Sequence, residues 1–331
     1  MKKILLICAL LFTAISATAD EATEAQALLQ KMHTASEKNN YIGTFVFQQA
    51  QDNQLMSSRI THSFSAGNEN EKVERLDGRP HEYIRHNEDI TSYQPDTKTL
   101  RHEKRQAQDI FPAVLAFNDA NLAEHYRFKL AEVARVAGNE CRMINVVPKD
   151  QLRYGYRLCA AVTSNLMLQA QTLDANNKVL EQIAFVSLTI GNVDENLIKP
   201  TYPNTKEWEV VRGTEAVSVT SGWVVKNMPD GFKKIREVRR LISPHTDAAS
   251  TPAVAHKIKL HEVLQLVFSD GLATISVFVE STKTGNHHGV SHQGATTFFG
   301  RQQGDYWITF VGEVPLAAIK LMSDSIEYKM K

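Results

Sequence analysis

The sequence has no excess of charge of either sign. It contains 37 lysines and arginines and 37 aspartates and glutamates, so its formal net charge is zero at pH 7. A protein that binds the phosphate backbone of nucleic acids usually carries an excess of positive charge on its surface. The charge balance therefore gives no support for a nucleic-acid partner.

Long apolar runs are also absent, except for one at the start of the chain. Two lysines precede an apolar run from Ile4 to Ile15, and the small residues Ala17 and Ala19 follow it. This layout is typical of a secretory signal peptide, and the run is too short to span a bilayer as a helix. The sequence predicts a signal peptide over residues 1–19 and export of the rest.

Cysteines are scarce: there are three, and Cys8 lies inside the predicted signal peptide. Export brings the other two, Cys141 and Cys159, into an oxidising compartment where they can pair. Both lie in segments of alternating apolar and polar residues, which predict the two strands of a β-hairpin. A disulfide across this hairpin is one interpretation, and two buried thiols on neighbouring strands is the other.

One register of this hairpin suits both the cysteines and the apolar residues. If Cys141 lies opposite Cys159, Met143 faces Arg157 and residues 149–151 form the loop. One face then carries the apolar side chains of Ile144, Val146, Tyr154, Tyr156 and Leu158, and the other carries both cysteines with Arg153 and Arg157. A slip of one residue would turn one apolar set to the wrong face.

The sequence also lacks the common catalytic signatures, since it has no P-loop, no dinucleotide fingerprint and no HExxH pair. His287, His288 and His292 lie in one glycine-rich segment, but their spacing matches no metal-binding motif and no thiol or carboxylate completes them. A solvated polar loop is the simpler interpretation. The sequence therefore predicts no enzyme, no cofactor and no metal site.

The rest of the chain predicts one helix followed by many strands. Thr23 and Gln26 form a capping-box pattern, and apolar residues then recur at helical spacing as far as Ala35. From Tyr41 the period changes to two, and half-polar segments alternate with short turns. We expect an α+β fold with a sheet that curls and encloses something on its concave face.

Residues 199–214 indicate a boundary between two domains. They contain Pro200 and Pro203 and show no clear period, which favours a linker. The mature chain is longer than a single hydrophobic core usually is. We therefore expect a larger domain over residues 20–198 and a smaller one over residues 215–331.

A basic stretch follows the linker, with the sequence FKKIREVRR from Phe232 to Arg240. As a regular strand it would put Lys234, Arg236 and Arg240 on one side. This stripe could hold an anionic partner or a lipid headgroup, or it could be an exposed edge that its charges keep from aggregating.

Five short segments of the chain resemble one known family. They are RYGYRL (Arg153 to Leu158), LEQ (Leu180 to Gln182), MPDGF (Met228 to Phe232), SDGL (Ser269 to Leu272) and VGEVP (Val311 to Pro315). In this order they resemble the periplasmic sigma-E regulatory proteins RseB and MucB, over nearly all of the mature chain. Cys159 departs from the family pattern, which has a large aromatic residue after RYGYRL, so the disulfide is inferred from spacing alone.

The resemblance implies a two-domain negative regulator of the sigma-E envelope stress response, located in the periplasm. Its N-terminal domain would be similar to the lipoprotein carriers LolA and LolB, a half-open antiparallel β-barrel with helices. Its smaller C-terminal α/β domain would bind the periplasmic part of the anti-sigma factor RseA and shield it from proteolysis. Lipopolysaccharide or another acyl lipid would release RseA.

Two sites are expected within this scheme. Acyl chains would bind the apolar patch of Phe111, Val114, Leu115 and Phe117, although the same patch could simply fill the barrel. The stripe of Lys234, Arg236 and Arg240 would contact RseA. The alternative function is a periplasmic lipid or lipoprotein carrier without a regulatory partner, and the sequence leaves open whether the protein forms a homodimer.

Overall fold

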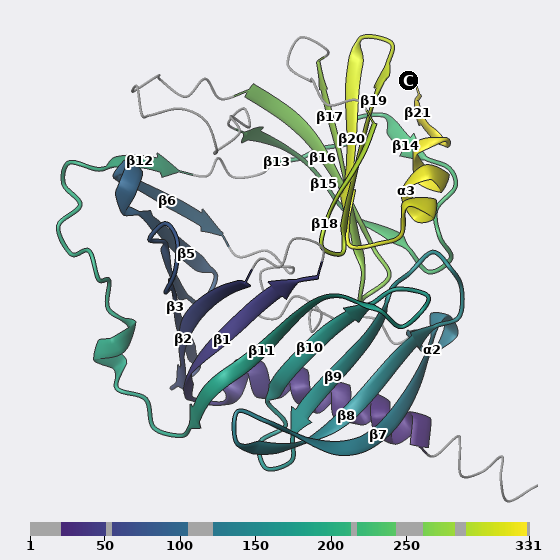
Figure 1. Ribbon diagram of the computed structural model, residues 1–331. Helices are drawn as coiled ribbons and strands as arrows, with labels where there is room; N and C mark the ends of the chain where they lie inside the picture. Colours follow the sequence, from purple (N-terminus) through teal and green to yellow (C-terminus); the bar gives the residue numbers. More distant parts are fainter. Residues whose placement is uncertain are drawn as a thin grey trace, which may run out of the picture.

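The protein is built mainly from antiparallel β-sheet (Figure 1). A computed structural model describes residues 21–50, 55–104, 122–212, 217–242, 261–281 and 289–329. Two large sheets follow one another along these parts of the chain, and a two-stranded sheet accompanies the second. None of the helices in these ranges is long and apolar enough to cross a membrane.

The first sheet has twelve strands. In chain order they are β1 (Tyr41–Gln49), β2 (Leu55–Ser65), β3 (Asn68–Arg75), β4 (Glu82–His86), β5 (Asp89–Gln94), β6 (Thr99–Lys104), β7 (Tyr126–Val136), β8 (Asn139–Pro148), β9 (Gly155–Ala161), β10 (Met167–Leu173), β11 (Val179–Ile190) and β12 (Glu209–Arg212). Across the sheet their order is β12-β6-β5-β4-β3-β2-β1-β11-β10-β9-β8-β7. The terminal strands β12 and β7 do not pair with each other, so this sheet does not close into a barrel.

The predicted N-terminal helix is present over residues 21–38, and it packs against one face of strands β7–β10 (Figure 1). Its spacing at positions 25, 29 and 32 brings Ala25, Leu29 and Met32 onto one buried face. Those three side chains join Ile144 and Leu158 in one core. Three single-turn helices, η1 (Pro95–Thr97), α2 (Leu122–His125) and η4 (Glu195–Ile198), lie in the connections.

The opposite face of the same sheet carries a second core. It runs from Ile60 and Val73 through Tyr41 and Phe185 to the two cysteines, all of them buried. Because successive strand residues point to opposite faces, β8 and β9 contribute to both cores at once. The sheet is therefore covered on both sides near its centre.

The second sheet has seven strands in the order β13-β15-β16-β17-β20-β19-β18. They are β13 (Val217–Ser218), β15 (Lys233–Ile242), β16 (His261–Ser269), β17 (Thr274–Ser281), β18 (Gly289–Gln293), β19 (Thr296–Gln303) and β20 (Tyr306–Gly312). The helix α3 (Leu316–Ser323) packs against β19 and β20, and β14 (Trp223–Val225) pairs with β21 (Ile326–Tyr328). Since α3 is the one helix described after residue 217, the expected α/β architecture is wrong and this part is mostly sheet.

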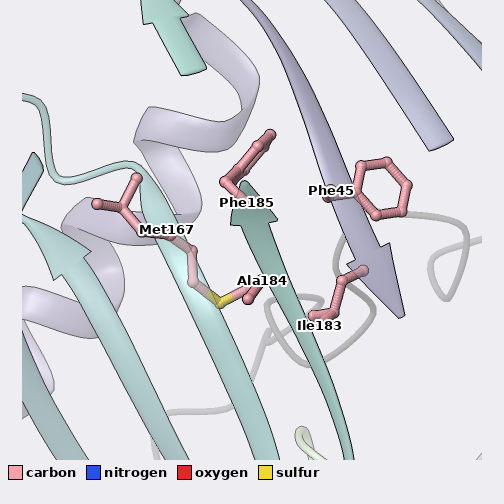
Figure 2. Close-up of a pocket in the computed structure, with 6 residues that line it drawn as sticks. Phe45, Met167, Ile183, Ala184 and Phe185 are labelled. Atoms are coloured by element: carbon pink, nitrogen blue, oxygen red, sulfur yellow. The ribbon is translucent and has the colours of Figure 1, made fainter. Parts of the chain in front are cut away.

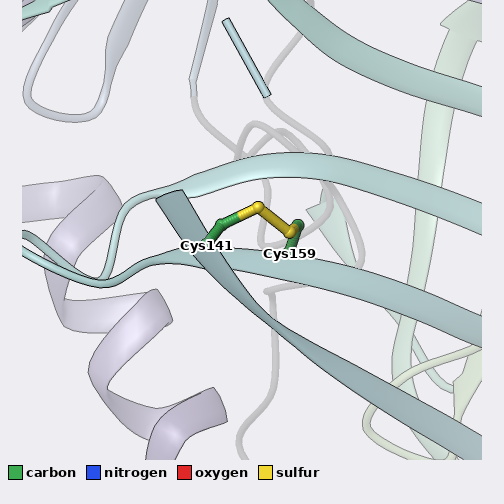
Figure 3. Close-up of a disulfide and its surroundings, with 2 residues drawn as sticks. All are labelled: Cys141 and Cys159. Atoms are coloured by element: carbon green, nitrogen blue, oxygen red, sulfur yellow. A yellow bond between two sulfur atoms is a disulfide. The ribbon is translucent and has the colours of Figure 1, made fainter. Parts of the chain in front are cut away.

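The cysteine hairpin forms as predicted, with a different register. Cys141 and Cys159 are joined by a disulfide whose Cα atoms lie 5.4 Å apart (Figure 3). However, Cys141 lies opposite Ala161, and Cys159 lies opposite Met143. This register differs from the predicted one by two residues, so the apolar and cysteine faces are preserved while the loop grows to residues 149–154.

The segment expected to be a linker is attached to the first sheet. Glu209–Arg212 forms β12, which runs parallel to β6. Before it, the Lys72 ammonium donates to the carbonyl of Lys199 at 3.0 Å, and the Thr201 backbone N–H donates to Glu82 at 3.1 Å. Hydrogen bonds therefore hold residues 199–212 against the first sheet, which their irregular sequence pattern does not predict.

Candidate functional site

The two large sheets meet at a buried ion pair. Arg153 lies in the loop between β8 and β9, and Asp270 lies in the turn between β16 and β17. Arg153 Nε donates to Asp270 Oδ2 at 2.7 Å, and the side chains of both residues are fully buried. The same guanidinium also contacts the Asp150 carboxylate and the backbone carbonyl of Asp230. One side chain of the first sheet thus binds two separate segments of the C-terminal part.

Both oxygens of the Asp270 carboxylate accept hydrogen bonds from neighbouring groups. Its Oδ1 accepts hydrogen bonds from the backbone N–H groups of Leu272 at 2.9 Å and Ala273 at 2.8 Å, which shapes the turn between β16 and β17. Its Oδ2 accepts from Arg153 and from the Tyr126 hydroxyl, the latter at 2.9 Å. Burial, together with neighbouring groups that include Asp270, raises the pKa of Tyr126 well above its usual value. The tyrosine therefore acts as a permanent hydrogen-bond donor here.

Apolar contacts surround this polar centre. Leu272 packs into the core of the first sheet beside Tyr126, and Leu152 packs against the core of the second. The Arg153 guanidinium carbon lies 5.7 Å from the Tyr126 ring centroid and 5.4 Å from that of Phe232. Leu152 from the first part of the chain thus packs against the core of the second sheet, and Leu272 from the second part packs into the core of the first. The ion pair lies between them.

A second contact joins the sheets through Glu181 on β11. Its Oε2 accepts from the backbone N–H of Ala295 at 3.0 Å, in the turn between β18 and β19. The preceding Gly294 has φ +58°, and a Cβ there would lie 2.4 Å from the Glu181 carboxylate, so the turn needs glycine to approach this closely. Burial raises the pKa of Glu181.

A further carboxyl, Glu313, lies within the electrostatic reach of Glu181. The Glu313 side chain is exposed to solvent, although protein atoms lie around much of it. Burial and the negative charge of Glu181 raise the pKa of Glu313 to about 7. The second contact is therefore sensitive to protonation near neutral pH.

All five segments that carry the family resemblance contribute to this junction. RYGYRL supplies Arg153, SDGL supplies Asp270, MPDGF supplies the Asp230 carbonyl, LEQ supplies Glu181 and VGEVP supplies Glu313. Sequence reasoning recognised these segments without assigning them a role. Their meeting depends on contacts between residues as far apart in the chain as Arg153 and Asp270, which local patterns do not reveal.

An apolar pocket lies on the first sheet where β1, β10 and β11 run side by side (Figure 2). It is lined by Phe45, Met167, Leu168, Ile183, Ala184 and Phe185. The Phe45 and Phe185 rings pack edge to face, with centroids 6.2 Å apart. This lining has no charged group, but its side chains leave no room for a ligand in this structure.

A buried polar network borders the same core. His62 stacks on Tyr41 with ring centroids 5.1 Å apart and contacts Glu69 at 3.1 Å. Arg85 donates to Glu69 at 2.7 Å and to Glu71 at 3.2 Å. Both contacts are made by Arg85 Nη2, whereas Arg85 Nε and Nη1 are buried without a hydrogen-bond partner among the described residues, so the network is only partly satisfied.

The basic strand does not form the predicted stripe. β15 has a bulge between Lys234 and Arg236, so Lys234 lies opposite Phe268, whereas Arg236 lies opposite Val267. Since neighbouring residues of β16 point to opposite faces, Lys234 and Arg236 lie on opposite faces of the sheet. Arg240, opposite Val263, shares the face of Arg236 and donates to Gln265 at 3.1 Å. The expectation of one basic face is therefore wrong.

The remaining predicted site residues have different outcomes. Phe111, Val114, Leu115 and Phe117 lie outside the described residues, as do His287 and His288. His292 is exposed on β18. In the described parts of the chain, no group of three or more histidine, cysteine, aspartate and glutamate side chains is arranged to hold a metal ion.

The comparisons with known proteins cover both sheets. The family description "MucB/RseB N-terminal domain" matches residues 24–209, and "MucB/RseB C-terminal domain" matches residues 217–327. The sigma-E factor regulatory protein RseB of Haemophilus influenzae is 26% identical, and the match covers 99% of this chain and all of that protein. The sigma factor AlgU regulatory protein MucB of Pseudomonas aeruginosa is 28% identical over 96% of this chain and 95% of its own.

Solved structures agree with these matches. The MucB chain of the Pseudomonas aeruginosa MucA/MucB complex superposes with a TM-score of 0.70 at 25% identity, covering 93% of this chain and all of that one. MucB in complex with periplasmic MucA gives a TM-score of 0.68 at 24% identity and also covers 93% of this chain. The chain belongs to the MucB/RseB family.

Proposed function

We propose that this protein is a periplasmic negative regulator of the sigma-E envelope stress response. It binds the periplasmic segment of an anti-sigma factor of the RseA/MucA type and shields that segment from proteolysis. The observation that carries the proposal is the match of both MucB/RseB domains in order, together with a superposition on MucB from the MucA/MucB complex over 93% of the chain. The disulfide of Cys141 and Cys159 suits an oxidising compartment such as the periplasm.

The domain organisation follows the same proposal. Residues 20–198 form the lipid-sensing domain and residues 215–331 the domain that binds the anti-sigma factor. The buried pair of Arg153 and Asp270 fixes one relative to the other. A partner that contacts both domains would therefore meet a preformed surface, which lowers the entropic cost of binding.

Lipid sensing is the second part of the proposal. The apolar pocket beside Phe45 and Phe185 would have to widen to take an acyl chain. The patch of Phe111, Val114, Leu115 and Phe117 remains the predicted second wall of the lipid site. Lipopolysaccharide or a similar lipid would bind here and release the anti-sigma factor.

The alternative is a carrier that delivers lipids or lipoproteins without a regulatory partner. The apolar pocket does not separate the two functions, because an apolar surface would serve a carrier and a lipid-sensing regulator equally well. The buried junction favours the regulator, because a carrier has no need of a second domain fixed by an ion pair.

A binding experiment separates the two functions. The mature protein is mixed with the immobilised periplasmic segment of the anti-sigma factor from the same organism, with and without lipopolysaccharide. The regulator should bind without lipid and dissociate when lipid is added, and a scrambled segment of the same composition is the control. Lipid binding with no retention on the segment would favour the carrier and rule out the regulator.

A further inference from the structure

The outermost strands of the two large sheets differ in how their free edges are protected. Natural sheets keep such edges from pairing with other chains by short strands, charged side chains or bulges. β13 has two residues and β12 has four. β7 is long, with 11 residues, but it has a bulge between Leu130 and Val133 and exposed charges at Arg127, Lys129, Glu132 and Arg135.

β18 is slightly longer than β12 and β13 and carries neither a formal charge nor a bulge. Its five residues, Gly289–Gln293, are all exposed, and none of them is lysine, arginine, aspartate, glutamate or proline. Its ladder with β19 runs without a register shift from Gly289 opposite Gly300 to Gln293 opposite Thr296. Within the described ranges β18 pairs with β19 alone and ends the sheet (Figure 1).

An open strand edge has a specific chemistry. Every second residue directs its backbone N–H and C=O away from the sheet, so an extended peptide can pair there as an additional strand. Five residues span about 17 Å, at roughly 3.3 Å per residue. On one face Val290, 44% exposed, adds an apolar side chain beside the incoming strand. An uncharged edge also selects no particular charge in its partner.

The position of β18 connects this edge to the junction. The turn that follows it is fixed by the hydrogen bond from the Ala295 backbone N–H to Glu181, at 3.0 Å. Gln49 of β1 also lies at this turn, because a Cβ on Gly294 would lie 2.9 Å from its side-chain nitrogen. A peptide that pairs with β18 and continues past Gln293 therefore reaches the first sheet.

We propose that β18 is a strand-addition site for an extended stretch of about five residues in the periplasmic segment of the anti-sigma factor. This inference rests on the proposed function and adds where and how the partner binds. A second copy of the chain fits less well, because two five-residue edges alone bury far less than the roughly 1,000 Å² that a stable dimer needs. A partner segment adds contacts at the junction, which an edge-to-edge dimer does not.

Hydrogen exchange locates the bound segment. The mature protein is measured alone and with a saturating amount of the synthetic periplasmic segment. We expect slower exchange over residues 289–293 in the complex, by at least tenfold, because the outward amides gain hydrogen-bond partners. Binding without any slowing over these residues would overturn the proposal and leave the proposed function intact, whereas no binding at all would remove both.

Two single prolines test the backbone pairing. Consecutive N–H groups of an edge strand point alternately to β19 and to the free edge, so either Val290→Pro or Ser291→Pro removes an outward donor. The variant that removes an outward donor should keep the parental Tm and bind the anti-sigma segment at least tenfold more weakly. The variant that removes a donor to β19 should have a lower Tm. Ser291→Lys, which adds a charge and keeps every backbone donor, should also weaken binding without lowering the Tm.

Pairing of β18 with a second copy of the chain is tested by the same measurements. If a second copy occupies β18, residues 289–293 should exchange more slowly as the concentration of the free protein increases, and a dimer should appear in sedimentation. That result, or full affinity of both proline variants and of Ser291→Lys, would overturn the proposal. Lys226→Ala, at an exposed ion pair with Glu327 away from β18, is the matched control and should bind like the parent.

Discussion

Arg153 and Asp270, which are 117 residues apart in the chain, form an ion pair with no solvent-exposed side-chain surface. Removing both charges from water costs several kcal/mol for each ion, so such a pair is maintained only when hydrogen bonds satisfy both partners. Here the carboxylate accepts from Arg153, Tyr126, Leu272 and Ala273. The pair therefore fixes the geometry of the junction more than it adds to net stability.

The first prediction is that Asp270→Ala strongly destabilises the protein. It leaves the Arg153 guanidinium buried without its main acceptor, which typically costs about 3–5 kcal/mol. Urea unfolding of the mature protein measures the loss. Asp150→Ala is the control, since Asp150 also contacts Arg153 but its side chain is 35% exposed, and it should cost about 1 kcal/mol or less. Equal small losses in both variants would show that the junction is not coupled to folding.

The second prediction concerns pH. Burial and Glu181 raise the pKa of Glu313 to about 7, above its value in the unfolded chain. Between about pH 4.5 and pH 7 the Glu313 carboxyl is therefore ionised in the unfolded chain but still protonated in the folded protein. The free energy of unfolding falls as the pH rises through this range, and the full loss is reached above pH 7.

Glu313→Gln should remove that penalty. Because Glu313 is exposed, we expect a gain of about 1 kcal/mol or less at pH 8, and a clearly smaller gain at pH 5. Thermal unfolding at both values measures it, with Asp324→Asn as a control at the exposed C-cap residue of α3. An equal Tm shift at both pH values would mean that Glu313 does not titrate in this range.

In the cysteine hairpin, the division into an apolar face and a cysteine face followed from the sequence, but the register did not. Alternation decides only whether two residues share a face, and a shift of two residues preserves that assignment while changing every partner. The observed register of the cysteine hairpin differs from the predicted one by such a shift, so Ile144 lies opposite Leu158 and not opposite Tyr156. The reason is Arg153, which lies in the loop because it binds Asp270, a residue that no local pattern connects with it.

The basic strand was mispredicted for a related reason. The sequence gives no signal that β15 has a bulge between Lys234 and Arg236, because a bulge depends on its pairing with β16. The five family segments were recognised, whereas their convergence on one junction needed the three-dimensional structure. The sequence predicted the N-terminal helix, most of the strands and the disulfide. It did not predict the strands at Gly289–Gln293 and Glu209–Arg212, which were interpreted as a polar loop and as part of a linker.

The third prediction is that the disulfide contributes to stability. Closing a chain over a separation of 18 residues should stabilise the folded state by about 3 kcal/mol in the chain-entropy model. Cys141→Ala combined with Cys159→Ala should lower the free energy of unfolding by at least that amount. Urea unfolding measures this loss, and peptide mapping under non-reducing conditions shows directly whether the two cysteines are paired. Two alkylatable thiols in native protein exported to the periplasm would contradict the pairing.

The fourth prediction separates the two faces of β15. Arg236→Glu and Lys234→Glu should differ in their effect on binding of the anti-sigma segment, because the bulge directs the two side chains to opposite faces. We expect Arg236→Glu to weaken binding by up to about fivefold, as ion pairs at the surface contribute about 1 kcal/mol, and added salt to weaken the parent complex. Equal affinity in both variants and the parent would show that the basic residues only protect the strand from aggregation.

The last prediction concerns the lipid site. If Leu115 lines a lid over bound acyl chains, Leu115→Asp should leave the Tm near the parental value and abolish lipid-triggered release of the anti-sigma segment. If the patch is only core, the same change should lower the Tm strongly, because an unpaired buried carboxylate is costly. Leu168→Asp provides the reference for that cost, since Leu168 is 1% exposed beside Phe185. A Tm loss for Leu115→Asp as large as that of Leu168→Asp would therefore remove the patch from the lipid site and leave the pocket of Phe45 and Phe185 as the surface to test next.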